Sequence, residues 1–201
     1  GNVGGILIHH DEPTRREAIR RALAGGINWF DTAAQYGNGR SEKALGALLP
    51  ASGPPPYLST KFQLDVENLD DIPGRIEASL RASLARLQRP SVDVLQLHNR
   101  IGTKAGGRVM TVAQVLGKNG VAEGMERLRE QGLIRHLGIT AIGEAAAVRE
   151  VVVSEKLEAM QERREAAQNG FNCEHVVPQS WFDKSEPQRS DLHHLFTCES
   201  N

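Results

Sequence analysis

The chain has 201 residues, enough to bury a full hydrophobic core in one domain or to form two smaller domains. Its 24 basic side chains nearly balance 25 acidic ones, so the formal charge of −1 gives no general reason to expect nucleic acid, an acidic substrate or an anionic membrane as partner. The sequence has neither an apolar run approaching the roughly 20 residues that span a bilayer nor a basic-then-apolar signal sequence at its start, so no membrane partner is expected.

The first expected element is a helix over residues 14–24. Thr14 is a good N-cap residue, and Glu17, three residues on, would complete a capping box. Gly25 and Gly26 would end the helix, and the apolar residues 27–30 then predict a short strand. This helix and strand form the first of several similar units.

Helical and extended patterns alternate three more times along the chain. The expected helices cover residues 41–50, 69–87 and 121–131, and the expected strands cover residues 57–60, 92–97 and 134–140, with a glycine-rich loop at 102–107. Repeats of about 30 to 40 residues are typical of a parallel barrel or a doubly wound sheet. Because a complete barrel needs about 250 residues, we expect an α/β fold with part of a TIM (β/α)8-type barrel. The start at Gly1 suggests that the chain comes from a longer protein.

Four side chains suited to proton transfer follow three successive expected strands: Asp31, Tyr36, Lys61 and His98. Functional residues of parallel-strand folds gather at the carboxyl ends of the strands, so these four are expected to converge. A tyrosine hydroxyl ordinarily titrates near pH ~10, and a neighbouring ammonium favours its phenolate form. An aspartate can hold that lysine charged and in place, and an imidazole can orient a carbonyl substrate. Taken singly, each residue is more often structural, since a strand-end aspartate is often only a helix cap.

The residues around these four resemble the signature of the aldo-keto reductases over residues 1–152. The resemblance is carried by Gly26-Ile27-Asn28-Trp29-Phe30-Asp31-Thr32-Ala33, Tyr36-Gly37, Ser41-Glu42, Ser59-Thr60-Lys61 and Leu97-His98. It implies a cytoplasmic enzyme that reduces a small-molecule carbonyl to an alcohol with NADPH. In that reaction Tyr36 would be the general acid and base, Lys61 and Asp31 would tune it, and His98 would position the carbonyl.

The same resemblance implies that Asp31 and Thr140 contribute to cofactor binding. Thr140, in Gly138-Ile139-Thr140, takes the place of a family serine that touches the nicotinamide amide, whereas Ala141 departs from the usual asparagine. The family holds the adenosine phosphate with loops from the last two barrel strands, which this chain lacks. Impaired turnover is therefore expected. His9 and His10 lie beside Asp11 and Glu12, where a solvated loop is favoured over a metal site.

From about residue 153 the sequence changes character. A charged helical pattern runs from residue 154 to 168, and the segment that follows is rich in histidine, proline and tryptophan. The expected domains are therefore residues 1–152 and residues 153–201. Both cysteines, Cys173 and Cys198, lie in the second, where they could form a disulfide or each have lost a partner.

Glu174 and His175 are the main chemical candidates of this second segment. In an extended segment their side chains would face opposite ways, so that Glu174 could hold Mg²⁺ against a phosphate while His175 deprotonates the attacking water. The segments Glu174-His175, Pro178-Gln179-Ser180 and Ser190-Asp191-Leu192-His193-His194 resemble the endonuclease I family of His-Me finger nucleases.

That second resemblance implies a small α+β fragment of a His-Me finger, with DNA or RNA as its partner and an origin in a secreted or periplasmic protein. Arg189 would contact phosphate, whereas His193 and His194 are more readily explained as packing residues. Three functions thus stay open: an aldo-keto reductase with impaired turnover, a Mg²⁺-dependent endonuclease, and an inactive fusion or assembly artefact.

Overall fold

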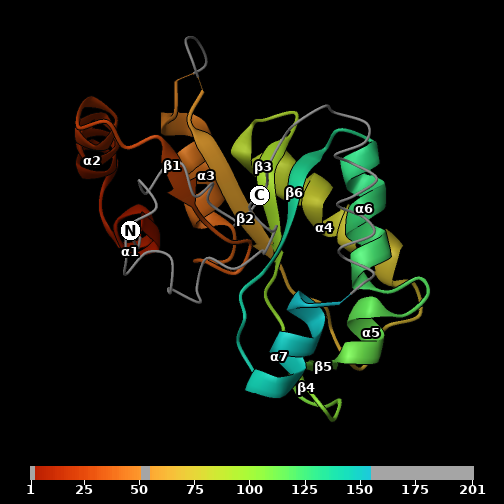
Figure 1. The fold of residues 1–201 in the computed structure, drawn as a ribbon. Coiled ribbons are helices and arrows are strands. Elements are labelled where there is room, and N and C mark those ends of the chain that lie inside the picture. The colour runs from red at the N-terminus through yellow and green to blue at the C-terminus, as the bar shows by residue number, and fades with distance from the viewer. Residues whose placement is uncertain (1–2, 51–54, 155–201) are drawn as a thin grey trace, which may run out of the picture.

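The computed structural model describes residues 3–50 and 55–154. Its centre is a sheet of four parallel strands in the order β1-β2-β3-β6 (Figure 1). The strands are β1 (Trp29–Asp31), β2 (Tyr57–Phe62), β3 (Val92–Leu97) and β6 (Ile134–Ile139). All four lie where the sequence predicts strands, and each pairs with its neighbour in parallel. The described residues therefore form the parallel part of an α/β barrel-type fold.

Helices alternate with the strands as the repeating pattern predicts. They are α2 (Glu12–Ala24), α3 (Arg40–Leu48), α4 (Ile72–Leu87) and α6 (Val121–Glu130), and α3, α4 and α6 cover one face of the sheet (Figure 1). The amphipathic spacing of α4 places Ile76, Leu80 and Leu87 in the core, each almost fully buried. The opposite face of the sheet carries the polar side chains that reach the strand ends.

The start of α2 differs from the prediction. Asp11, not Thr14, is the N-cap residue, since its carboxylate accepts a hydrogen bond of 3.0 Å from the Thr14 backbone N–H. Pro13 then falls in the first turn, where its missing N–H costs nothing. Glu17 pairs with Arg20 and Arg21 on the helix surface instead of completing a capping box. An aspartate followed by Glu-Pro was the stronger start signal.

Several short elements were not predicted. One is at the N-terminus, and the others lie near the carboxyl ends of the strands. They are α1 (Val3–His9), β4 (Arg100–Gly102), β5 (Val109–Thr111), α5 (Val112–Leu116) and α7 (Ala145–Val152). β4 and β5 pair on either side of the turn that the sequence predicts as a glycine-rich loop over 102–107. Figure 1 shows β4, β5, α5 and α7 grouped beyond the carboxyl ends of β3 and β6.

The register of the sheet decides which side chains share its polar face. Asp31 is paired with Ser59, and Lys61 with Gln96, and side chains of paired residues project to the same side of a parallel sheet. The alternate residues, such as Phe30 and Leu95, are buried in the hydrophobic core. Within the described ranges, helices long and apolar enough to cross a membrane are lacking.

Candidate active site

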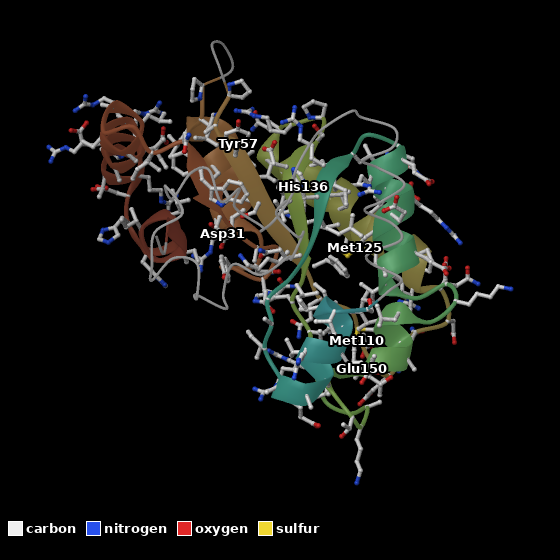
Figure 2. The ribbon with its side chains drawn as sticks, in the orientation of Figure 1. Asp31, Tyr57, Met110, Met125, His136 and Glu150 are labelled. Atoms are coloured by element: carbon white, nitrogen blue, oxygen red, sulfur yellow. The ribbon has the colours of Figure 1, made fainter. Side chains whose placement is uncertain are left out.

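The four side chains predicted to act together lie at the carboxyl ends of three neighbouring strands. Asp31 ends β1, Lys61 lies one residue before the end of β2, and His98 directly follows β3, while Tyr36 is in the turn between β1 and α3. Figure 2 labels Asp31 at this end of the sheet and Tyr57 at the opposite end. The backbone joins these ends, because the His98 N–H donates to the Phe62 carbonyl at 2.8 Å.

Lys61 and Asp31 form an ion pair inside the rim that the carboxyl ends of these strands make. The Lys61 Nζ lies 2.5 Å from Asp31 Oδ2 and also donates to the Thr32 carbonyl at 2.8 Å. The other carboxylate oxygen accepts from the Ser59 hydroxyl at 2.5 Å. The Lys61 side chain is only 7% exposed, and burying an ammonium is costly unless it is paired. The carboxylate thus compensates a buried positive charge and fixes its position.

The Tyr36 ring lies against both Lys61 and His98. The Lys61 Nζ is 5.0 Å from the centroid of the Tyr36 ring, and the His98 ring meets the same ring edge-on, with centroids 6.0 Å apart and planes at 80°. The convergence expected from the strand ends is therefore present in the structure. An ammonium, a phenol and an imidazole share one small volume.

The surroundings of His98 keep its ring neutral near pH 7. Burial lowers the pKa of His98, the Lys61 ammonium and the Arg108 guanidinium lower it further, and the Asp31 carboxylate partly opposes them. The ring Nδ1 lies 3.2 Å from Gln35 Oε1. This contact of Gln35 with His98 was not predicted from the sequence. The only feature that could have drawn attention to Gln35 is its position directly before Tyr36.

A buried polar network holds α3 and the turn that carries Tyr36. Glu42, fully buried, accepts from the Thr60 hydroxyl and from Arg86 Nε, both at 2.6 Å. The Thr32 and Ser41 hydroxyls lie 2.8 Å apart beside it. In the sequence, Ser41-Glu42 is recognisable only as part of the family signature. In the structure, the hydrogen bonds of these two side chains fix α3 to β1, β2 and α4.

Thr140 and Ala141 follow β6, next to the end of β3. The Thr140 backbone N–H donates to the Leu97 carbonyl at 3.1 Å, and its hydroxyl donates to the same oxygen at 3.3 Å. That hydroxyl keeps lone pairs that can accept from an amide N–H. Ala141 has a φ of 51°, a left-handed conformation that asparagine tolerates better than alanine. The donor set fits a nicotinamide amide through Thr140, and the backbone at 141 has the conformation that suits the family's asparagine.

Metal-binding residues are not grouped in the part of the chain that the structure covers: no cluster of three or more His, Cys, Asp or Glu side chains occurs within residues 3–50 and 55–154. Asp11, beside His9 and His10, instead caps α2. The expected nuclease residues Glu174 and His175, with Arg189 and the two cysteines, lie outside the described residues.

All four residues of this rim fall within the part of the chain that a protein-family model matches. The model of the aldo/keto reductase family matches residues 7–177. The chain therefore belongs to the aldo/keto reductase family. The match continues past the predicted domain boundary at residue 152.

The chain is also similar to individual proteins over more than two thirds of its length. The chain is 32% identical over 145 residues to L-galactose dehydrogenase of Arabidopsis thaliana, covering 71% of this chain and 42% of that protein. It is 32% identical to the Bacillus subtilis aldo-keto reductase YhdN, covering 69% of this chain and 40% of that protein. The chain thus spans about two fifths of the length of these relatives.

Solved structures of aldo-keto reductases match about two thirds of the chain. An aldo-keto reductase of Bacillus halodurans in its holo form matches with a TM-score of 0.53 and 28% identity, covering 67% of this chain and 43% of that one. A Klebsiella pneumoniae aldo-keto reductase in complex with NADPH matches with a TM-score of 0.51, covering 64% of this chain and 39% of that one. At 22% identity, this second likeness shows the fold alone.

These matches lend no support to the expected nuclease segment, to Mg²⁺, to a nucleic acid partner, to a fusion of two families or to impaired turnover. The His-Me finger resemblance and the boundary at residue 152 stay predictions from the sequence.

Proposed function

We propose that this protein reduces the carbonyl group of a small molecule to an alcohol, with NADPH as the hydride source. The observation that carries the proposal is the position of the Lys61 ammonium, 5.0 Å from the Tyr36 ring and paired with Asp31. A fixed positive charge beside a phenol can stabilise the negative charge that the phenol oxygen gains as it passes its proton to a substrate. Family membership supports the same chemistry.

In this reaction Tyr36 donates its proton to the carbonyl oxygen. When bound, NADPH supplies the hydride that the carbonyl carbon receives, so the product is a neutral alcohol. Lys61 stabilises the negative charge left on the Tyr36 oxygen, and Asp31 with the Thr32 carbonyl keeps the ammonium in place. Proton transfer then restores the phenol from solvent.

His98 and Thr140 are proposed to orient the two reactants. His98 stands edge-on to Tyr36 and is neutral, so its ring nitrogens can hydrogen-bond a substrate without adding a charge. Thr140 offers its hydroxyl oxygen to the nicotinamide amide of NADPH. Asp31 contributes to cofactor binding at the same rim through its partly exposed carboxylate.

Isotope transfer tests the proposed function directly. The purified chain is incubated with a panel of aldehydes and ketones and with NADPH carrying deuterium at the transferable position of the nicotinamide ring. We expect deuterium on the carbinol carbon of the product alcohol, measured by mass spectrometry. An alcohol that forms without deuterium, or no alcohol from any carbonyl, would contradict the proposal.

A further inference from the structure

Asparagine is followed by glycine three times in the chain, at Asn38-Gly39, Asn119-Gly120 and Asn169-Gly170. The third pair lies outside the described residues. In such a pair the backbone nitrogen of the glycine can attack the side-chain carbonyl carbon of the asparagine, because glycine has no Cβ to obstruct the approach. Whether a pair reacts therefore depends on what holds its two reacting groups.

The two described pairs have the same backbone conformation and the same exposure. Asn38 has a φ of 54° and Asn119 a φ of 52°, a left-handed conformation that asparagine tolerates. Both asparagines are exposed, and the glycine that follows each of them is buried. A difference in reactivity between the folded pairs would therefore come from their hydrogen bonds rather than from exposure.

The hydrogen bonds differ at both reacting groups. The Asn119 Oδ1 accepts from Arg127 Nη2 at 2.9 Å, and the Gly120 N–H donates to a preceding backbone carbonyl at 3.0 Å. Because a guanidinium can only donate, the amide oxygen of Asn119 must be its partner. Neither the Asn38 side-chain amide nor the Gly39 N–H has a hydrogen-bond partner among the described residues. The Asn38 amide can therefore rotate toward the Gly39 nitrogen without breaking a hydrogen bond, whereas the pair at 119 must give up two.

We propose that Asn38 is a site of spontaneous modification, at which the asparagine converts to aspartate or isoaspartate while Asn119 stays intact. The Gly39 nitrogen forms a bond to the Asn38 Cγ, the bond from Cγ to Nδ2 breaks, and the proton of the Gly39 N–H leaves with that nitrogen as ammonia. Water then opens the five-membered imide at either of its two carbonyl carbons. Opening at the backbone carbonyl gives isoaspartate, which adds one methylene carbon to the main chain.

The modified residue lies in the turn that carries the proposed proton donor. Tyr36 comes two residues before Asn38, and its carbonyl accepts from the Ser41 N–H at 3.3 Å, so the turn closes on the first residues of α3. A longer main chain with an added carboxylate at residue 38 would separate these partners and shift the Tyr36 ring from Lys61. We therefore expect isoaspartate at this position to inactivate the enzyme, a part of the proposal that rests on the proposed function.

Peptide mapping by mass spectrometry tests the modification without cofactor or substrate. The folded protein is incubated in warm, mildly alkaline buffer, and the conversion of amide to acid is followed at each asparagine. We expect conversion at Asn38 to be about 10-fold or more faster than at Asn119, since each of the two hydrogen bonds at 119 slows the reaction there several-fold. Equal rates in the folded protein would overturn the proposal.

Two comparisons show whether the hydrogen bonds cause the difference. Arg127→Met removes one of them and should raise the rate at Asn119 about 3- to 10-fold, whereas the control Arg81→Met, at an exposed site on α4, should change neither rate. In concentrated urea the rates at Asn38 and Asn119 should become equal. No change at Asn119 in Arg127→Met, or a difference between the sites that persists in urea, would overturn the proposal.

The activity during the same incubation tests the consequence for Tyr36. Asn38→Gly accepts the left-handed backbone and cannot form the imide, so its kcat should stay constant while that of the wild type falls in proportion to the isoaspartate fraction. A wild type that keeps its full kcat after conversion would overturn the proposed inactivation. If Asn38 converts as expected but neither form reduces any carbonyl, the proposed function fails while the modification site stands.

Discussion

The Lys61 ammonium lies 5.0 Å from the centroid of the Tyr36 ring, although one residue is on β2 and the other is in the turn that follows β1. Parallel pairing of β1 with β2 brings the two together, and Asp31 holds the ammonium at 2.5 Å. At this separation, and with the lysine side chain largely removed from water, the charge acts on the phenol with little screening.

Replacing the ammonium while keeping the bulk of the side chain should abolish most of the activity. Lys61→Met removes the charge beside Tyr36, and we expect kcat for carbonyl reduction to fall by about 10²-fold or more. Lys43→Met, on the exposed face of α3, is the control and should retain wild-type kcat. Equal kcat in Lys61→Met and wild type would show that the phenol does not need this charge.

Removing the partner carboxylate should destabilise the fold. In Asp31→Asn the buried Lys61 ammonium loses its counter-ion, and we expect the free energy of unfolding in urea to fall by about 1–2 kcal/mol. The expected loss is smaller than for a fully buried pair because the Asp31 side chain is 37% exposed. Asp70→Asn, at an exposed site, should lose much less. Equal losses in the two variants would argue against a structural ion pair.

Stability should decrease below about pH 6.5 because of His98. The folded state lowers the pKa of His98 from its ordinary value of 6.5, so below that value the unfolded chain binds more protons than the folded one. The free energy of unfolding should therefore fall between about pH 7.5 and pH 5.5. In His98→Gln this fall should be smaller, as urea titrations at the two pH values can measure. An equally steep fall in the variant would exclude His98 as its cause.

Restoring the family's asparagine at residue 141 should improve stability and cofactor binding. Ala141 has a left-handed φ of 51°, which costs an alanine more than an asparagine. We expect Ala141→Asn to raise the free energy of unfolding by about 0.5–1 kcal/mol and to tighten NADPH binding in a fluorescence titration. Ala146→Asn, on the exposed surface of α7, should do neither. Weaker NADPH binding in Ala141→Asn would place the nicotinamide away from Thr140.

The parallel sheet was predictable because buried strands and amphipathic helices leave clear periodic patterns. The strand over 92–97 agrees residue for residue with β3, whose residues are mostly buried. The expected helix start at Thr14 was wrong by two residues because Asp11, which was not recognised as a cap from the sequence, is the N-cap of α2. β4, β5 and α5 were missed because three-residue strands and a five-residue helix are too short to show a period.

The site was predictable only in part, because the strand ends can be placed from the sequence but the side-chain contacts between loops cannot. Asp31 and Lys61 lie at the carboxyl ends of β1 and β2, and His98 directly follows β3, so their meeting could be expected from topology once the strands were placed. The hydrogen bond between the His98 ring and Gln35 Oε1 and the ion pair between Arg86 and Glu42 join residues far apart in the chain. Such contacts depend on the side-chain conformations of packed loops, and no local pattern encodes them.

A comparison of the two tyrosines tests the central claim most directly, because the chain contains only Tyr36 and Tyr57. Tyr57 begins β2, at the opposite end of the sheet from Asp31 (Figure 2). NADPH oxidation is followed with a saturating carbonyl substrate in Tyr36→Phe, in Tyr57→Phe and in the wild type. We predict a loss of about 10²- to 10⁴-fold in kcat for Tyr36→Phe and wild-type kcat for Tyr57→Phe. Wild-type kcat in Tyr36→Phe would contradict the assignment of Tyr36 as the proton donor.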